Sequence, residues 1–130
     1  MAYLLDAGTL AEVLRSVPSR SLVRRLTTIP PRDRWTSVIS VSQLLLAARR
    51  SKNPKLMQDV IRLVASVKVA SFDLLAAQSF AKFRATASPD GDPDDVMIAA
   101  IAAANDFTLV TRRAADFGRY PHLRVEDWTG

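Results

Sequence analysis

The sequence predicts an α/β fold: a single domain, residues 1–130, with a mostly parallel sheet covered by helices on both faces. Short apolar segments alternate with amphipathic helical patterns along the whole chain, as in parallel sheets. The first segment, Tyr3–Leu5, ends in Asp6, and a buried helix after Asp92 leads into another strand. Ligands of such sheets bind outside the carboxyl ends of the strands, so these acids indicate where a site would lie.

The amino-terminal half is predicted to hold two strands and four helices. The first helix has Leu10, Val13 and Leu14 on one face, and Pro30-Pro31 ends the second. The elements in order are a strand over Tyr3–Leu5, helices over Thr9–Val17 and Ser19–Thr28, a strand over Trp35–Val41, a helix over Gln43–Arg50, and a helix from Pro54 to about Val64.

The carboxyl-terminal half continues the alternation. Asp92 is a good N-cap, Pro93 suits the first helical position, and the run Val96–Ala104 is apolar throughout, which predicts a helix buried on more than one face. The other elements are a strand over Val67–Ser71, a helix over Phe72–Thr86, a turn over Ala87–Pro93, a strand over Phe107–Thr111, a short turn or helix over Arg112–Phe117, and a strand over Leu123–Val125.

Composition excludes several classes of protein. The chain has no cysteine and one histidine, His122, so a disulfide framework and a thiolate or histidine zinc site are not expected. The net charge of +5, mostly from arginine, favours nucleic acid or acidic partners, although a merely basic surface explains it equally well.

The apolar segments are too short for a membrane protein. The longest apolar run has nine residues, against the ~18 that a spanning helix needs. The amino-terminal apolar run lacks a basic flank and contains Asp6, unlike a signal peptide. We therefore expect a cytoplasmic protein with no membrane partner.

Carboxylates are the remaining candidates for a site. The four glycines match no phosphate-binding motif, and His122 lies in an expected surface turn, unsuited to a catalytic triad. Several carboxylates without histidine or cysteine suit Mg²⁺ or Mn²⁺, although each acid alone is equally a helix cap or a solvated charge. The candidates are Asp6, Asp95 and Asp116, with Asp92, Asp94 and Asp106 nearby.

Four segments together resemble the PIN domain family, and more narrowly its VapC-type toxins of toxin–antitoxin pairs. They are YLLDA at 3–7, SVISVSQLLLAAR at 37–49, PDDVMIAAIAAANDFTLVTRRAADF at 93–117 and LRVEDW at 123–128. The resemblance implies a three-layer α/β/α sandwich around a parallel sheet of about five strands. It also implies a Mg²⁺-dependent endoribonuclease, with Mn²⁺ as a possible substitute, that forms a homodimer and is blocked by a cognate antitoxin.

The resemblance assigns roles to individual residues. Asp6, Asp95 and Asp116 match the family's catalytic, metal-binding acids, and Thr111 matches a hydroxyl that often lines the pocket. Beside the resemblance, Thr111, Arg112 and Arg113 are candidate RNA contacts, and solvated charge is an equal alternative for the two arginines.

The chain departs from the family pattern at two places. Ala7-Gly8 replaces the usual Thr-Asn or Thr-Ser after Asp6, and Gln43, expected on the first helical turn, replaces the second catalytic acid, a glutamate. The sequence leaves open whether Gln43 is natural or a deliberate substitution. It predicts a weakened ribonuclease, or alternatively a PIN module that binds RNA or an antitoxin peptide without turnover. A phosphoacceptor receiver domain is disfavoured, because its acid pair and lysine are missing.

Overall fold

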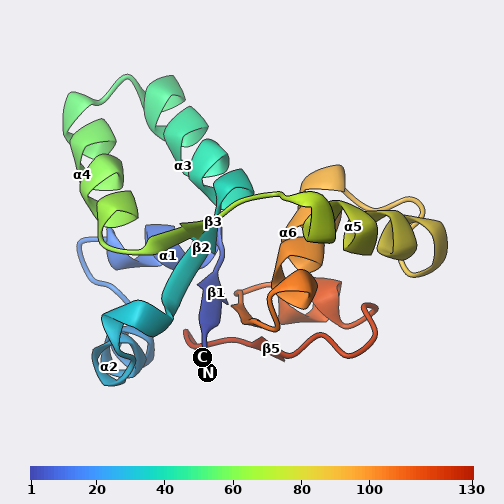
Figure 1. The fold of residues 1–130 in the computed structure, drawn as a ribbon. Helices are drawn as coiled ribbons and strands as arrows, with labels where there is room; N and C mark the ends of the chain where they lie inside the picture. Colours follow the sequence, from blue (N-terminus) through green and yellow to red (C-terminus); the bar gives the residue numbers. More distant parts are fainter.

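The computed structural model describes residues 1–130 and confirms the predicted α/β class, with helices on both faces of a central sheet (Figure 1). All strand pairs are parallel, in the order β3-β2-β1-β4-β5, so the first strand of the chain lies at the centre. The strands are β1 (Tyr3–Leu5), β2 (Arg34–Ser37), β3 (Lys68–Ala70), β4 (Thr108–Val110) and β5 (Val125–Glu126).

Six α-helices form the outer layers. Figure 1 shows α1 to α4 on one side of the sheet and the α5–α6 pair on the other. The helices are α1 (Ala7–Val13), α2 (Arg20–Thr28), α3 (Val38–Ser51), α4 (Pro54–Ala65), α5 (Leu74–Thr86) and α6 (Pro93–Ala104), with short 3₁₀ turns at Pro31–Asp33 and Ala114–Phe117. None of these helices combines the length and apolar character needed to cross a bilayer.

Two hydrophobic cores lie on the two faces of the sheet, because successive side chains of a strand point to opposite faces. Leu4 and its register partner Leu109 belong to the core beneath α5 and α6. Leu5 and its partner Val110 belong to the core beneath α1 to α4. The alternation within β1 and β4 therefore produces the three-layer arrangement.

Helix α6 is buried on several sides, as its apolar run predicts. It begins after Asp92, whose side chain accepts a hydrogen bond from the backbone N–H of Asp94 at 2.9 Å. Its buried residues are Val96, Ile98, Ala99, Ala100, Ile101 and Ala102. The small alanines let α5 approach closely, and the cap holds the acidic first turn at the sheet edge.

The predicted strand over Trp35–Val41 was wrong beyond Ser37. The Ser37 hydroxyl accepts a hydrogen bond from the Ser40 N–H at 2.9 Å and caps α3, so the β-branched residues that follow are helical. Consequently Gln43 is the sixth residue of α3 and lies in its second turn, not in the first.

Three other boundaries differ from the predictions for similar reasons. Helix α1 begins at Ala7 because Asp6 is its N-cap, and α5 begins at Leu74 because Asp73 is its N-cap. Strand β5 covers Val125–Glu126, two residues later than expected, because its register with β4 places Val125 opposite Leu109.

Candidate active site

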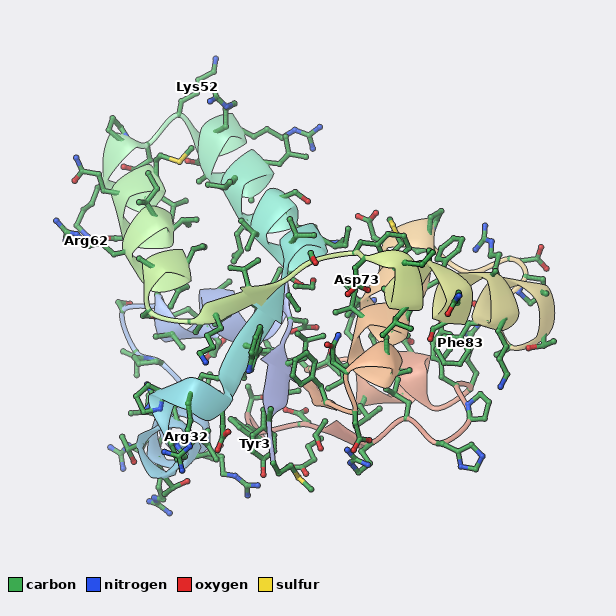
Figure 2. All side chains as sticks on the ribbon, in the orientation of Figure 1. Tyr3, Arg32, Lys52, Arg62, Asp73 and Phe83 are labelled. Carbon is green, nitrogen blue, oxygen red and sulfur yellow. The ribbon has the colours of Figure 1, made fainter.

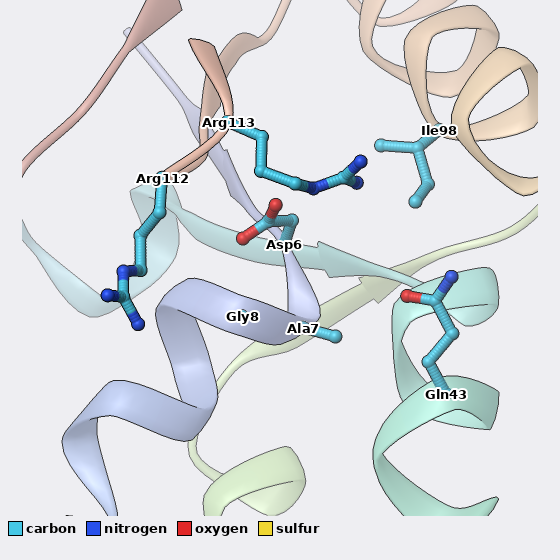
Figure 3. Close-up of a pocket in the computed structure, with 7 residues that line it drawn as sticks. All are labelled: Asp6, Ala7, Gly8, Gln43, Ile98, Arg112 and Arg113. Atoms are coloured by element: carbon cyan, nitrogen blue, oxygen red, sulfur yellow. The ribbon is translucent and has the colours of Figure 1, made fainter. Parts of the chain in front are cut away.

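An open pocket of about 500 Å³ lies at the carboxyl ends of β1 and β4 (Figure 3). The strand order reverses between these two strands, since β2 and β3 extend from one side of β1 while β4 and β5 extend from the other. Open parallel sheets bind their ligands at such a point. The pocket is lined by Asp6, Ala7, Gly8, Gln43, Ile98, Arg112 and Arg113.

Asp6 is held rigidly at the end of β1 and is only 5% exposed. Its backbone N–H donates to the Val110 carbonyl at 3.1 Å, and its Oδ1 accepts from the Thr9 N–H at 2.9 Å. The Thr9 hydroxyl in turn donates to the Val110 carbonyl at 3.3 Å. Asp6 therefore caps α1, as expected, and lines the pocket, and its Oδ2 makes no protein hydrogen bond.

Arg113 connects the other two predicted acids. Its Nη2 and Nη1 donate to the two carboxylate oxygens of Asp95 at 2.7 and 3.0 Å, and Nη1 also reaches Oδ2 of Asp116 at 3.4 Å. The bonds with Asp95 raise the pKa of Arg113, and the charges of Asp95, Asp6 and Asp116 act in the same direction, against partial desolvation. Figure 3 shows the Arg113 side chain extending past the Asp6 carboxylate. Arg113 thus pairs with two of the three predicted acids, while Asp6 acts on it only through its charge. Asp95 and Asp116 line a smaller neighbouring cavity and not the pocket that Asp6 lines.

The possible metal ligands near the pocket are of the types that suit a hard divalent cation. The potential metal ligands in this region are carboxylate and amide oxygens, and Mg²⁺ and Mn²⁺ prefer oxygen ligands. As the side chains stand, no three acidic residues form a compact ligand cluster, because Arg113 supplies the positive charge between Asp95 and Asp116. Metal binding by Asp6, Asp95 and Asp116 therefore remains a prediction.

Gln43 lines the pocket across from Asp6, from the second turn of α3 (Figure 3). Its Nε2 donates to Oδ2 of Asp94 at 3.0 Å and so connects α3 with the first turn of α6. Sequence reasoning treated Asp94 only as a neighbouring acid. No sequence signal pairs these two residues, which are separated by 51 positions.

Glu12 is a buried acid that sequence reasoning missed, since it resembles an ordinary helix residue. It is 5% exposed and accepts bonds from Arg15 at 3.2 Å, from the Ser19 N–H at 3.2 Å and from Arg112 at 3.3 Å. Its partner Arg112 lies 100 positions away in the sequence. Glu12 therefore holds the Arg112 guanidinium at the wall of the pocket.

Thr111 is fully buried, and it is not among the pocket-lining residues. Its hydroxyl accepts a hydrogen bond from the Arg113 N–H at 3.0 Å. Thr111 thus shapes the turn that carries Arg112 and Arg113, while direct RNA contact by these three residues stays a prediction.

Comparisons with known proteins agree with this arrangement. The model of the PIN domain family matches residues 3–123. A curated Salmonella typhimurium protein, named tRNA(fMet)-specific endonuclease VapC, is 26% identical over 98% of both chains. The crystal structure of DNA-bound VapBC from Salmonella typhimurium superposes with a TM-score of 0.87, 25% identity and 98% coverage of both chains. VapBC-1 from nontypeable Haemophilus influenzae superposes with a TM-score of 0.86, at 25% identity and full coverage of both chains.

Proposed function

Because the chain belongs to the PIN domain family, we propose that it is a VapC-type toxin, a Mg²⁺-dependent endoribonuclease that hydrolyses RNA phosphodiester bonds. The observation that carries the proposal is that Arg113, which lines the pocket beside Asp6 where the strand order reverses, pairs with both Asp95 and Asp116. Two curated relatives that match nearly the whole chain are named endonucleases, and this supports the same activity.

The acidic residues would hold the divalent cation, Mg²⁺ or Mn²⁺, and Asp6 offers an oxygen with no other partner. When bound, the cation supplies Lewis acidity toward the phosphate and lowers the pKa of a nearby water. Arg113, once released from Asp95, can donate to phosphate oxygens in a bidentate manner. Arg112 is already positioned by Glu12 at the pocket wall, where it faces the same substrate group.

Partners follow from the same family assignment. Two of the similar solved structures are VapBC complexes, and we propose that a cognate antitoxin binds this chain and blocks the pocket. Homodimer formation and action on RNA in the cytoplasm belong to the same proposal.

Gln43 supports a second candidate function, a PIN module that binds RNA or the antitoxin without turnover. The resemblance places a glutamate here, and the amide of Gln43 is instead bonded to Asp94. This substitution removes one negative charge from the pocket. We therefore propose a weakened ribonuclease, with the non-catalytic module as the alternative.

The direct test is cleavage of end-labelled RNA by the purified chain. We expect internal cleavage products with Mg²⁺ or Mn²⁺, and none when a chelator removes the cation, because the carboxylates alone provide no Lewis acid. A total tRNA pool and an unstructured RNA serve as substrates. Tight RNA binding without any cleavage under either condition would favour the non-catalytic module.

A further inference from the structure

The α3–α4 hairpin is one of two strongly basic segments of the protein. The α3–α4 hairpin, residues 38–65, has five basic side chains and one acidic side chain, a net charge of +4 against +5 for the whole chain. The basic residues are Arg49, Arg50, Lys52, Lys55 and Arg62, and the acid is Asp59. The other basic segment, residues 20–34, also has a net charge of +4, and acids elsewhere in the chain offset the remaining basic residues.

Four of these charges form the hairpin tip, defined as Arg49, Arg50, Lys52 and Lys55. All four are exposed, and Figure 2 shows Lys52 at the end of the hairpin, away from the sheet. Only Lys55 has an acidic partner, Asp59 at 3.0 Å, and the Lys55 side chain remains 81% exposed. The tip thus presents unneutralised charge to solvent.

Helix stability explains only part of this pattern. Arg49 and Arg50 lie in the last turn of α3, where cations favour the helix dipole. Lys55 lies in the first turn of α4, where a cation is disfavoured by the dipole. Lys52 has a left-handed backbone with φ of 56°, a conformation that glycine adopts more readily. Lys52, at the carboxyl end of α3, is also favoured by the dipole, and Lys55 is offset by its ion pair with Asp59, so these roles leave the exposed charge of the tip available to a partner.

The hairpin tip is connected to the pocket by a single helix. Gln43 lines the pocket, and Arg50 follows seven residues later on the same face of α3. At 1.5 Å per residue the separation along the axis is about 10 Å. This separation is short enough for one polynucleotide to reach both the pocket and the tip.

We propose that the hairpin tip binds the phosphate backbone of the RNA substrate beyond the scissile bond. The inference rests on the proposed ribonuclease function and identifies a second contact surface for its substrate. Exposed arginine and lysine on a projecting element are the groups that neutralise backbone phosphates, and this contact is independent of base sequence.

A charge-matched pair of variants tests the proposal. The tip variant carries Arg49→Gln, Arg50→Gln and Lys52→Gln, and the control carries Arg20→Gln, Arg24→Gln and Arg32→Gln. All six residues are exposed and lack acidic partners, and each variant lowers the net charge from +5 to +2. Fluorescence anisotropy then measures binding of a labelled single-stranded RNA, with a chelator present, over a series of salt concentrations.

We expect the slope of log K against log salt to fall by roughly 2 in magnitude for the tip variant, since each lost contact to a single strand contributes about 0.7. The control should keep the wild-type slope, and melting curves should show both variants folded. Equal slopes for the tip variant and the wild type would overturn the proposed contact between the hairpin tip and RNA, and would leave the ribonuclease proposal standing. A wild-type chain without salt-dependent RNA binding would overturn both this inference and the ribonuclease proposal.

Discussion

Asp95→Asn is expected to lower the rate of RNA cleavage by more than about 100-fold, beyond the loss typical of an outer-shell partner of a metal ion. The amide removes a charged ligand of the proposed cation and also the two charge-assisted bonds to Arg113. Stability should change by less than about 1 kcal/mol, because the ion pair is partly exposed. Single-turnover cleavage and thermal melting separate the two effects.

Asp106→Asn is the matched control for this loss. Asp106 also pairs with an arginine, Arg124 at 2.9 Å, but it lies at the α6–β4 turn and does not line the pocket. We expect its cleavage rate to stay within about twofold of wild type, since surface ion pairs contribute little. Equal rates for Asp95→Asn and Asp106→Asn would show that Asp95 has no catalytic role.

Gln43→Glu is expected to tighten divalent-metal binding by at least about tenfold, roughly 1.4 kcal/mol, and to raise the cleavage rate with it. Glutamate has no N–H for Asp94, so two carboxylates would face each other where a 3.0 Å hydrogen bond now exists. Two like charges at 4 Å repel by roughly 4 kcal/mol at an effective dielectric near 20, and a divalent cation relieves that repulsion.

The readouts for Gln43→Glu are calorimetric metal titration, RNA cleavage at one salt concentration, and growth of a host that expresses the variant without antitoxin. Gln78→Glu adds the same charge on the exposed surface of α5 and should change none of them. Unchanged affinity and rate in Gln43→Glu would exclude position 43 from the metal site. Tighter metal binding without cleavage would favour the non-catalytic module.

Patterns local in the chain predicted most of the fold. The alternation of strands and helices identified the parallel sheet, and the Asp92 cap with its apolar run identified α6. Family resemblance selected Asp6, Asp95 and Asp116, and the sheet topology explains why the carboxyl ends of β1 and β4 bring acids to one edge. The strand, helix and cap signals each lie within a short stretch of sequence, whereas the resemblance rests on four segments spread along the chain.

Features that depend on contacts between residues far apart in the chain could not be predicted from one sequence. The burial of Glu12 depends on Arg112, and the orientation of Gln43 depends on Asp94. At the boundary between β2 and α3, the β-branched residues favoured a longer strand, whereas Ser37 favoured a helix start. The structure has the helix, which Ser37 caps. Tertiary contacts decide such cases.

The central claim, that this acidic edge holds a divalent cation, is tested most directly by calorimetric titration of Mn²⁺ into the wild-type chain and into Asp6→Asn. Asp6 is the buried acid with one carboxylate oxygen free of hydrogen bonds. We predict saturable binding to the wild type that is weakened at least about tenfold in Asp6→Asn, because a charged oxygen ligand is lost. Equal Mn²⁺ affinities in two equally folded proteins would contradict the claim.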